Sequence, residues 1–172
     1  MAVTEESDRA EMHEMIRQTA RDIAGQYDRE YWRTHADNNE FPQEYWDDLA
    51  DAGFLGTFVP EEYGGEGLGV QEMLIANEEL TRAGASSGIL FLLTPIFGAL
   101  TLSKHGTEEQ KEEYLPRIAD GDLRWCMALT EPEAGTNSLE MNTFAEKEGD
   151  EYVVNGTKQW ISGVNHAHGM LL

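Results

Sequence analysis

Cysteine and lysine are both scarce in this sequence. Cys126 stands alone among 172 residues, which excludes a disulfide framework and a cysteine-based metal site. Only four residues are lysine, and the 12 lysines and arginines face 33 aspartates and glutamates, for a formal charge of -21. Such a charge argues against nucleic acid as a partner. Because the acidic residues are spread along the chain, they favour a surface adapted to high salt over the alternative, an acidic mimic of DNA.

Long hydrophobic runs are absent as well. The longest, "GILFLLTPIFGALTL", is too short to span a bilayer and is interrupted by Pro95. The beginning, "MAVTEESDRAEM", is acidic and has no apolar core, so no signal peptide is expected. The sequence therefore predicts a cytoplasmic protein without a membrane partner.

Apolar residues recur at helical spacing in the first part of the sequence. Between Glu11 and Trp32 this spacing predicts a first helix. A second helix is expected to have Pro42 at its first position and to end at Gly53. The glycines of "VPEEYGGEGLG" fit no phosphate-binding motif, so we interpret this stretch as a turn-rich loop.

Three further helices are predicted before residue 122. The third covers residues 70–82, and the apolar fourth covers residues 87–104, bent or broken near Pro95. A helix apolar on most faces is a buried core helix or lines an apolar pocket. The fifth opens with a capping box formed by Thr107 and Gln110.

The composition changes after Gly121, where "LRWCMALT" and "EYVVNGTKQWIS" are rich in β-forming residues. The pair Asn155-Gly156 predicts a tight turn. We therefore predict an α+β fold, with an α-helical bundle over residues 1–122 and the start of a β-barrel-like domain over residues 123–172. The last strand, "GMLL", has no strand after it, so this β domain is expected to be partial.

The stretch "MALTEPEAGTNS" combines a strand with a polar turn. Pro132 removes one backbone donor, and Gly135 lets the backbone approach a ligand closely. Hydroxyl and amide side chains lie beside free backbone N–H groups at Thr130, Thr136, Asn137 and Ser138. Such a surface suits a flat polar heterocycle or a pyrophosphate. Taken alone, the stretch is better explained as an ordinary turn at the end of a strand.

The segment "KQWIS" adds an aromatic residue. If the two strands are neighbours, Trp160 places a broad apolar face near Thr130, and Ser162 adds a hydroxyl. An aromatic wall with hydroxyls at its polar edge fits an isoalloxazine ring.

Several motifs resemble those of the acyl-CoA dehydrogenase family, in the family's order and approximate spacing. They are "FPQEYWDDLADAGFLG", "VPEEYGGEGLG", "GTEEQKEEYLPRIADGD", "ALTEPEAGT" and "YVVNGTKQWIS". In that family a helical N-terminal domain is followed by a β domain and a C-terminal helical bundle. The resemblance implies that this chain holds the first domain and part of the second, without the C-terminal bundle.

The resemblance also implies which residues meet FAD. They are Met127, Ala128, Leu129, Thr130, Gly135, Thr136, Trp160, Ile161 and Ser162. Thr136 is expected to contact the acyl-CoA substrate too, at a position where the family usually has serine. Asn137 stands where the family commonly has aspartate, and Glu133 where it commonly has glycine, so the turn departs from the family pattern at two positions.

The chemistry implied by the resemblance is FAD-dependent α,β-dehydrogenation of an acyl-CoA thioester, a reaction of fatty acid metabolism. A carboxylate removes the α-proton while the β-hydrogen leaves as hydride to the flavin, which then reduces an electron-transfer flavoprotein. The catalytic carboxylate of the family belongs to its C-terminal domain. We therefore assign no catalytic residue, Glu131 and Glu133 included, and expect this chain alone to be inactive. The full-length protein is expected to be a homodimer or homotetramer.

Other readings of the residues stay open. A flavin oxidase or monooxygenase on the same scaffold is one alternative, and a truncated product or binding module without turnover is another. His166 and His168 form an H-x-H pair that is more typical of a surface loop than of a metal site. By resemblance of region, four residues are candidates for lining the pocket of the acyl chain, and core packing explains them equally well: Phe91, Thr94, Phe97 and Gly98.

Overall fold

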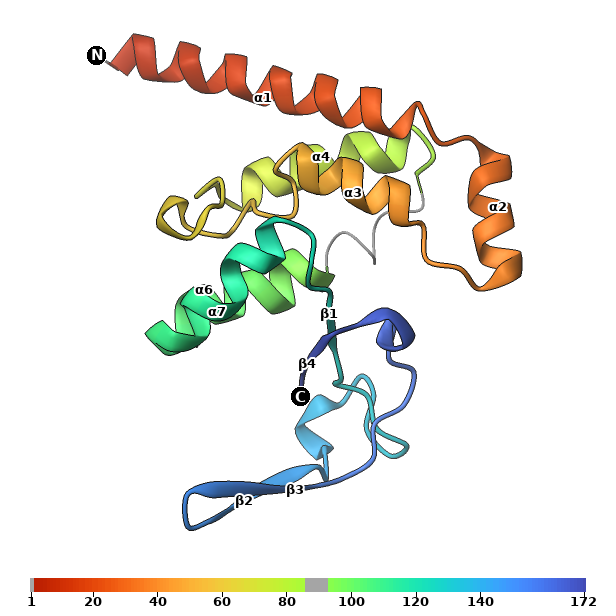
Figure 1. Cartoon of the computed structure of the whole chain (residues 1–172), viewed down its shortest axis with the longest axis vertical. Helices are drawn as coiled ribbons and strands as arrows, with labels where there is room; N and C mark the ends of the chain where they lie inside the picture. The colour runs from red at the N-terminus through yellow and green to blue at the C-terminus, as the bar shows by residue number, and fades with distance from the viewer. Residues whose placement is uncertain (1, 86–92) are drawn as a thin grey trace.

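The computed structural model describes residues 2–85 and 93–172, in which helices come first and short strands follow. The helices are α1 (Ala2–Ala24), α2 (Arg29–Asn38), α3 (Gln43–Asp51), α4 (Val70–Arg82), α6 (Thr101–His105) and α7 (Glu108–Ala119). A π-helical segment, Leu93–Leu100, leads into α6. The strands are β1 (Trp125–Met127), β2 (Phe144–Glu148), β3 (Glu151–Asn155) and β4 (Gly169–Leu171). Figure 1 shows the helices packed together, with the strands extending from one end of them. The predicted α+β class with an N-terminal helical bundle is confirmed.

The helical part is held by apolar side chains from α3, α4 and α7. Trp46 and Leu49 of α3, Leu80 of α4 and Leu115 of α7 are all buried. The indole N–H of Trp46 also donates to the carbonyl of Gly121 at 2.8 Å. The amphipathic spacing of α3 thus fixes both the core and the point where the chain leaves the helices.

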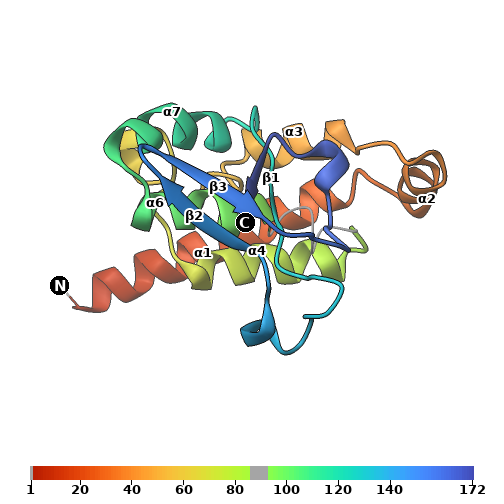
Figure 2. The same cartoon turned by 90° about the horizontal axis from the view of Figure 1, so that it is seen from below.

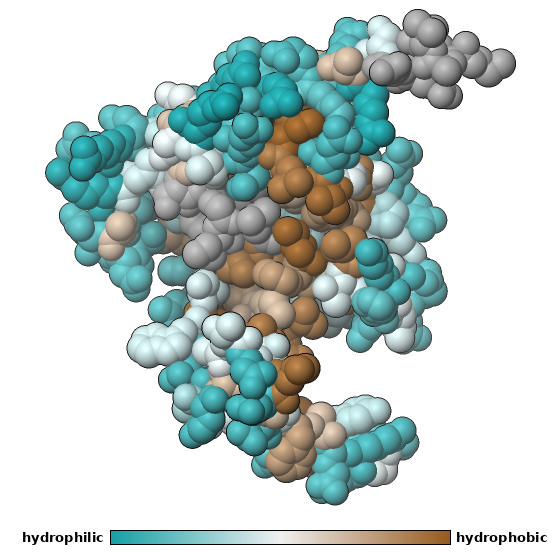
Figure 3. All heavy atoms as spheres, turned by 180° about the vertical axis from the view of Figure 1, so that it is seen from behind, coloured by the Kyte–Doolittle hydropathy of each residue, from teal (hydrophilic) through white to brown (hydrophobic). Residues whose placement is uncertain are grey.

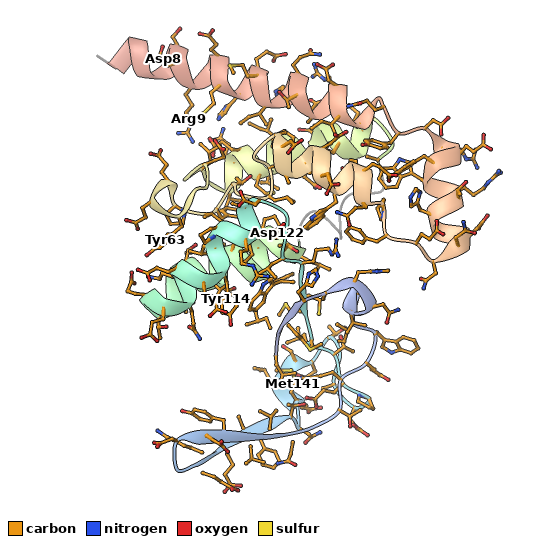
Figure 4. The ribbon with its side chains drawn as sticks, viewed as in Figure 1. Asp8, Arg9, Tyr63, Tyr114, Asp122 and Met141 are labelled. Carbon is orange, nitrogen blue, oxygen red and sulfur yellow. The ribbon has the colours of Figure 1, made fainter. Side chains whose placement is uncertain are left out.

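Helix α1 packs on α4 through charged groups as well as apolar ones. The carboxylate of Glu79 is buried in α4 and lies 2.8 Å from the Nε of Arg21 and 3.3 Å from an Nη of Arg17. Glu72, two helical turns earlier on α4, lies 3.1 Å from Arg9 and 2.9 Å from the ring of His13. Figure 4 shows Arg9 pointing from α1 toward α4. Both buried carboxylates are therefore paired, as buried charges must be.

The single helix predicted from residue 11 to residue 32 is wrong, because the chain turns within that range. Helix α1 ends at Ala24, and α2 begins after Asp28, whose side chain accepts from the N–H of Tyr31 at 2.9 Å. Apolar spacing continues across the break, since Tyr27 and Trp32 pack on Tyr45 of α3. The periodicity reflects a shared core and not one continuous helix.

Two other helix signals in the sequence are confirmed, and a third is off by one residue. Gly53, with a φ of 76°, follows the end of α3 as predicted, whereas Pro42 is the residue before the helix and not its first residue. The capping box is confirmed, with Thr107 and Gln110 each bonded to the other's backbone N–H. The predicted irregularity near Pro95 is a π-helix, a wide winding that accommodates a residue without an N–H. The start of that predicted helix, residues 87–92, lies outside the described residues.

The described strands form two small sheets and no closed barrel. Strand β1 pairs in parallel with β4, with Cys126 opposite Met170, and β2 pairs with β3 as an antiparallel hairpin. Every residue of the hairpin is exposed, and it extends away from the helices on the side of α6 and α7 (Figures 1 and 2).

The tight turn predicted at Asn155-Gly156 is wrong. The hairpin turns at Gly149, which has a φ of 65°, while Asn155 ends β3 opposite Phe144. A side chain at Gly156 would collide with Thr143. The glycine is therefore explained by the close approach of two chain segments, a use of glycine that the sequence pattern does not separate from a turn.

The surface carries some apolar area. Figure 3 shows apolar residues exposed on the back of the molecule. A groove between α1 and the loop before α4 is lined in part by Met12, Met15, Ile16, Phe54 and Leu68. Within the described ranges, no helix has the length and hydropathy needed to cross a membrane.

Candidate cofactor site

The end of β1 lies beside the segment that follows β3. The N–H of Gln159 donates to the carbonyl of Thr130 at 2.9 Å, and its side-chain amide donates to the carbonyl of Glu131 at 3.2 Å. The ammonium of Lys158 donates to the carbonyl of Leu129 at 3.0 Å. The two segments expected to be neighbours are in contact. The predicted strands do not reach this contact. Strand β1 ends at Met127, and the residues of "KQWIS" belong to no strand.

The polar turn after β1 is fixed by its own backbone. The N–H of Glu131 donates to the carbonyl of Ala134 at 2.8 Å, and the reverse bond measures 3.3 Å. Both residues are buried, whereas Gly135, Thr136 and Asn137 are exposed. Nothing lies within 4 Å of the place where a side chain at Gly135 would begin. The turn therefore presents an open face on a rigid base.

Three hydroxyls on these two segments have no hydrogen-bond partner within the part of the chain that the structure describes. Among residues 2–85 and 93–172, no hydrogen bond uses the side chains of Thr130, Thr136 or Ser162. Thr136 and Ser162 are exposed, and Thr130 is half-buried. These groups are free to donate to, or accept from, a bound molecule.

Trp160 has an unusual backbone conformation and an exposed ring. Its φ is 59°, in the left-handed region, and 82% of its surface is exposed. A bulky residue held there costs about 1–2 kcal/mol, and such strain is typical of binding and catalytic sites. The two hydrogen bonds of Gln159 hold the preceding residue in place. The ring is thus presented on the surface by a constrained backbone.

The remaining predicted site residues lie on the same two segments. Met127 is in β1, the N–H of buried Ala128 donates to the carbonyl of Leu171 at 2.8 Å, and Leu129 is exposed. Ile161 is half-buried next to Trp160. The structure brings the nine predicted residues onto adjacent segments, and their binding of FAD stays a prediction.

Two of the residues proposed for the acyl chain, Thr94 and Gly98, pack on Trp125. The backbone N–H of Trp125 donates to the hydroxyl of Thr94 at 2.8 Å, and a side chain at Gly98 would begin 2.9 Å from the indole. Thr94 and Gly98 are buried and Phe97 is half-buried. Phe91 lies outside the described residues. Core packing therefore accounts for Thr94 and Gly98, as the alternative reading held.

The two histidines of the H-x-H pair contact different residues. His168 accepts from the backbone N–H of Arg124 at 3.1 Å, and partial desolvation together with the nearby Arg124 and Arg117 charges lowers its pKa, which favours the neutral ring. The ring of His166 lies 5.4 Å from the Phe41 ring, centre to centre, in a tilted contact. The Arg124 guanidinium lies 4.2 Å from the centre of the Phe41 ring and donates to the carbonyl of His166 at 2.9 Å. In the part of the chain that the structure describes, no three metal-ligating side chains gather.

Sequence reasoning missed the most buried charge pair of the site. Glu131 is 3% exposed, and its carboxylate lies 2.9 Å from the ammonium of Lys158. The backbone N–H groups of Asn142 and Thr143 donate to the same carboxylate at 2.6 and 2.9 Å. Lys158 is one of only two lysines after residue 122, which is the one sequence signal that could have drawn attention to it.

Comparisons with known proteins find the same family along almost the whole chain. The domain family "Acyl-CoA dehydrogenase, N-terminal domain" matches residues 10–122, and "Acyl-CoA dehydrogenase, middle domain" matches residues 126–172. Acyl-CoA dehydrogenase FadE12 of Mycobacterium tuberculosis is 36% identical over 163 residues, which are 95% of this chain and 42% of that protein.

Two solved structures extend this likeness to the fold. An acyl-CoA dehydrogenase from Geobacillus kaustophilus is 33% identical with a TM-score of 0.80, over 91% of this chain and 41% of that one. An acyl-CoA dehydrogenase complexed with FAD from Bacillus anthracis is 36% identical with a TM-score of 0.74, over 88% of this chain and 27% of that one. This chain spans about two fifths of the length of the curated relative described above. It belongs to the acyl-CoA dehydrogenase family.

Proposed function

We propose that the protein carrying this chain catalyses FAD-dependent α,β-dehydrogenation of acyl-CoA thioesters. The observation that supports this best is the contact between the turn after β1, whose hydroxyls have no partner among the described residues, and the segment that carries the exposed Trp160. Because the chain spans about two fifths of a relative's length, the activity is proposed for the whole protein. In this proposal residues 1–122 form the helical domain and residues 123–172 part of the flavin-binding domain.

The donor set of the site fits a flavin. Neutral hydroxyls at Thr130, Thr136 and Ser162 and an open backbone at Gly135 suit a polar heterocycle and its phosphates, and Trp160 offers an apolar face. We assign Thr130 to the pyrimidine edge and Ser162 to the reactive edge of the ring. FAD would supply the acceptor for the hydride that leaves the β-carbon.

Thr136 is assigned to both ligands. Its exposed hydroxyl has no protein partner among the described residues, so one oxygen is available to the cofactor phosphate or to the acyl-CoA. The methyl group that distinguishes threonine from serine limits the rotation of this hydroxyl and leaves its hydrogen-bonding capacity intact.

The catalytic base is assigned to none of the carboxylates in this region. Glu131 is buried and already accepts from three donors, and the Lys158 ammonium together with the nearby N–H groups lowers the pKa of Glu131 to about 2. A carboxylate in that state is a poor acceptor for an α-proton. Glu133 is exposed on the turn, and no side chain in the described ranges bonds to its carboxylate. The base is therefore proposed to come from another part of the protein.

The partners follow from the same proposal. An acyl-CoA is the substrate, an electron-transfer flavoprotein receives the electrons, and the protein is a homo-oligomer. A flavin oxidase on this scaffold differs only in passing electrons to O₂, and a non-catalytic protein would bind flavin without bleaching it.

One experiment separates these outcomes. The protein is purified, its bound cofactor is identified by absorbance and mass, and it is mixed with acyl-CoAs of increasing chain length under anaerobic conditions. We expect a yellow protein whose flavin bleaches with at least one acyl-CoA and is reoxidised by an artificial acceptor faster than by O₂. A colourless protein that turns over with NAD would contradict the proposal. Rapid reoxidation by O₂ with hydrogen peroxide release would identify an oxidase.

A further inference from the structure

Glu131 and Lys158 form the centre of a bonded network under the candidate site. The side chain of Glu131 is 2% exposed and that of Lys158 is 12% exposed. One carboxylate oxygen of Glu131 accepts from the N–H of Asn142 at 2.6 Å, and the other accepts from the N–H of Thr143 and the ammonium of Lys158, both at 2.9 Å. Residues from three separate stretches of the chain therefore meet at one carboxylate.

Lys158 and Gln159 donate hydrogen bonds to the backbone carbonyls of the residues that follow β1. Lys158 donates to the carbonyl of Leu129, and Gln159 donates to the carbonyls of Thr130 and Glu131. Three consecutive carbonyls are thus held by two consecutive residues. The donors of Lys158 and Gln159 are thus bonded to backbone carbonyls, and among the described residues the hydroxyls of Thr130 and Thr136 have no protein partner.

The network also reaches the base of the exposed hairpin. Met141, labelled in Figure 4, has its sulfur 3.7 Å from the ammonium of Lys158 and lies just before β2. Gly156, just after β3, approaches Thr143 so closely that any side chain there would collide. The hairpin enters and leaves the fold at this network.

We infer that Glu131 and Lys158 are positioning residues that fix the turn bearing Thr130 and Thr136 against the segment bearing Trp160. This inference rests on the proposed function, because the geometry that the pair fixes is that of the proposed flavin site. The pair touches neither ligand in this assignment. The pair acts by holding the turn after β1 and the segment of Trp160, which lie far apart in the sequence, at a fixed distance from each other.

A positioning role and a purely structural role predict different results for the double variant. Removing one partner leaves a buried charge without its partner, which destabilises the fold, whereas removing both can be nearly neutral. If the pair were only structural, stability and FAD affinity would recover together in Glu131→Gln/Lys158→Met. If the pair positions the site, stability recovers and FAD affinity does not, because the carbonyl of Leu129 and the turn lose their fixed donor.

The test uses the purified protein, with FAD removed and added back. We measure the thermal midpoint of the apoprotein, FAD affinity and the visible circular dichroism of the bound flavin. The variants are Glu131→Gln, Lys158→Met and the double variant. Matched controls on the exposed hairpin are Glu148→Gln and Lys147→Met, which make the same changes of charge. We expect each site variant, the double included, to weaken FAD binding on the order of tenfold, and the controls to leave it unchanged.

Lys158→Arg covers the case in which the single variants do not fold. It keeps the positive charge, but a planar guanidinium cannot reproduce the contacts of the ammonium with Leu129 and Glu131. A folded Lys158→Arg with an altered flavin circular dichroism supports the inference. A native spectrum in Lys158→Arg, or FAD affinity that recovers with stability in the double variant, overturns it while the proposed function stands. A wild-type protein that binds no flavin overturns both.

Discussion

Arg21 of α1 and Glu79 of α4 form a two-point contact, with the guanidinium Nε and Nη2 donating to the two carboxylate oxygens at 2.8 and 3.0 Å. Arg17 and Arg82 lie 3.3 and 3.7 Å from the same carboxylate, whose side chain is 1% exposed. Helix α1 is thus attached to the bundle by a buried charge, and its apolar contacts alone do not describe the interface.

Removing this carboxylate should loosen α1 selectively. In Glu79→Gln the three arginines lose their buried carboxylate partner and keep only the exposed Glu14 and Glu78, so we expect the thermal midpoint to fall by several degrees. Amide hydrogen exchange should quicken in α1 and stay slow in α7, which is packed elsewhere. Glu78→Gln, an exposed neighbour on the same helix, is the control and should have a much smaller effect. Equal effects of the two variants would show that the buried contact is not what holds α1.

The α1–α4 contact should also weaken in acid. Burial alone would raise the pKa of Glu72, but the hydrogen bonds from His13 and Arg9 outweigh it and lower this pKa to about 2. A carboxylate whose pKa is lower in the folded state stabilises the fold above its unfolded pKa, about 4.5, and this contribution is lost as the pH falls toward 2. We expect α1 to lose helicity in that window.

The measurement for this prediction is circular dichroism as a function of pH. Glu72→Gln should be less stable at pH 7 and should show a shallower loss between about pH 4.5 and 2, because one titrating group has been removed. Glu11→Gln, exposed on α1, should follow the wild-type curve. Identical curves for Glu72→Gln and the wild type would contradict the assignment of this pH dependence to Glu72.

Leucine-to-alanine changes at two positions should separate core from surface. Leu115 in α7 is fully buried, whereas Leu139 is 96% exposed. We expect Leu115→Ala to lower the free energy of unfolding by about 3 kcal/mol and Leu139→Ala to change it by less than about 0.5 kcal/mol. Chemical denaturation of both variants gives these values. A large effect at Leu139 would mean that this side chain is covered in the folded protein.

How far the sequence predicts this structure depends on the range of each signal. Short-range signals gave correct predictions at the capping box of Thr107 and at the helix end marked by Gly53. Apolar spacing did not locate the break after Ala24, because aromatic residues on both sides of it pack on the same helix. The turn predicted at Gly156 is wrong because, in sequence, a glycine required by the close approach of two segments looks the same as one required by a turn.

The candidate site shows the same limit. The hydroxyls and Trp160 could be chosen from residue types and from the family resemblance. The pairing of Glu131 with Lys158 could not, since it joins residues 27 positions apart through side chains, and neither residue type marks it. The left-handed backbone of Trp160 was equally hidden, because only glycine and a few small polar residues signal that conformation in sequence.

The formal charge of -21 predicts a dependence of stability on salt. At low ionic strength, repulsion among the acidic side chains acts over about 30 Å, whereas in molar salt it is screened within about 3 Å. We expect the thermal midpoint to rise through a KCl series. The charged contacts of Glu72 and Glu79 oppose this trend, but they are buried and respond weakly to salt. A midpoint that stays flat would show that the acidic surface is not a salt adaptation.

Thr136 provides the direct test of the proposed site. Its hydroxyl is exposed, has no protein partner among the described residues and lies on the open face of the turn. Thr136→Val keeps the shape and removes the hydroxyl, so we expect FAD or acyl-CoA to bind more weakly by about 1 kcal/mol, and by more if a charged oxygen loses its donor. Thr136→Ser should keep most of the affinity, and Thr34→Val, exposed on α2, should keep all of it. The measurement is a titration of the apoprotein with FAD and of the flavoprotein with a non-reacting acyl-CoA analogue. Unchanged affinity for both ligands in Thr136→Val would remove this residue from the site.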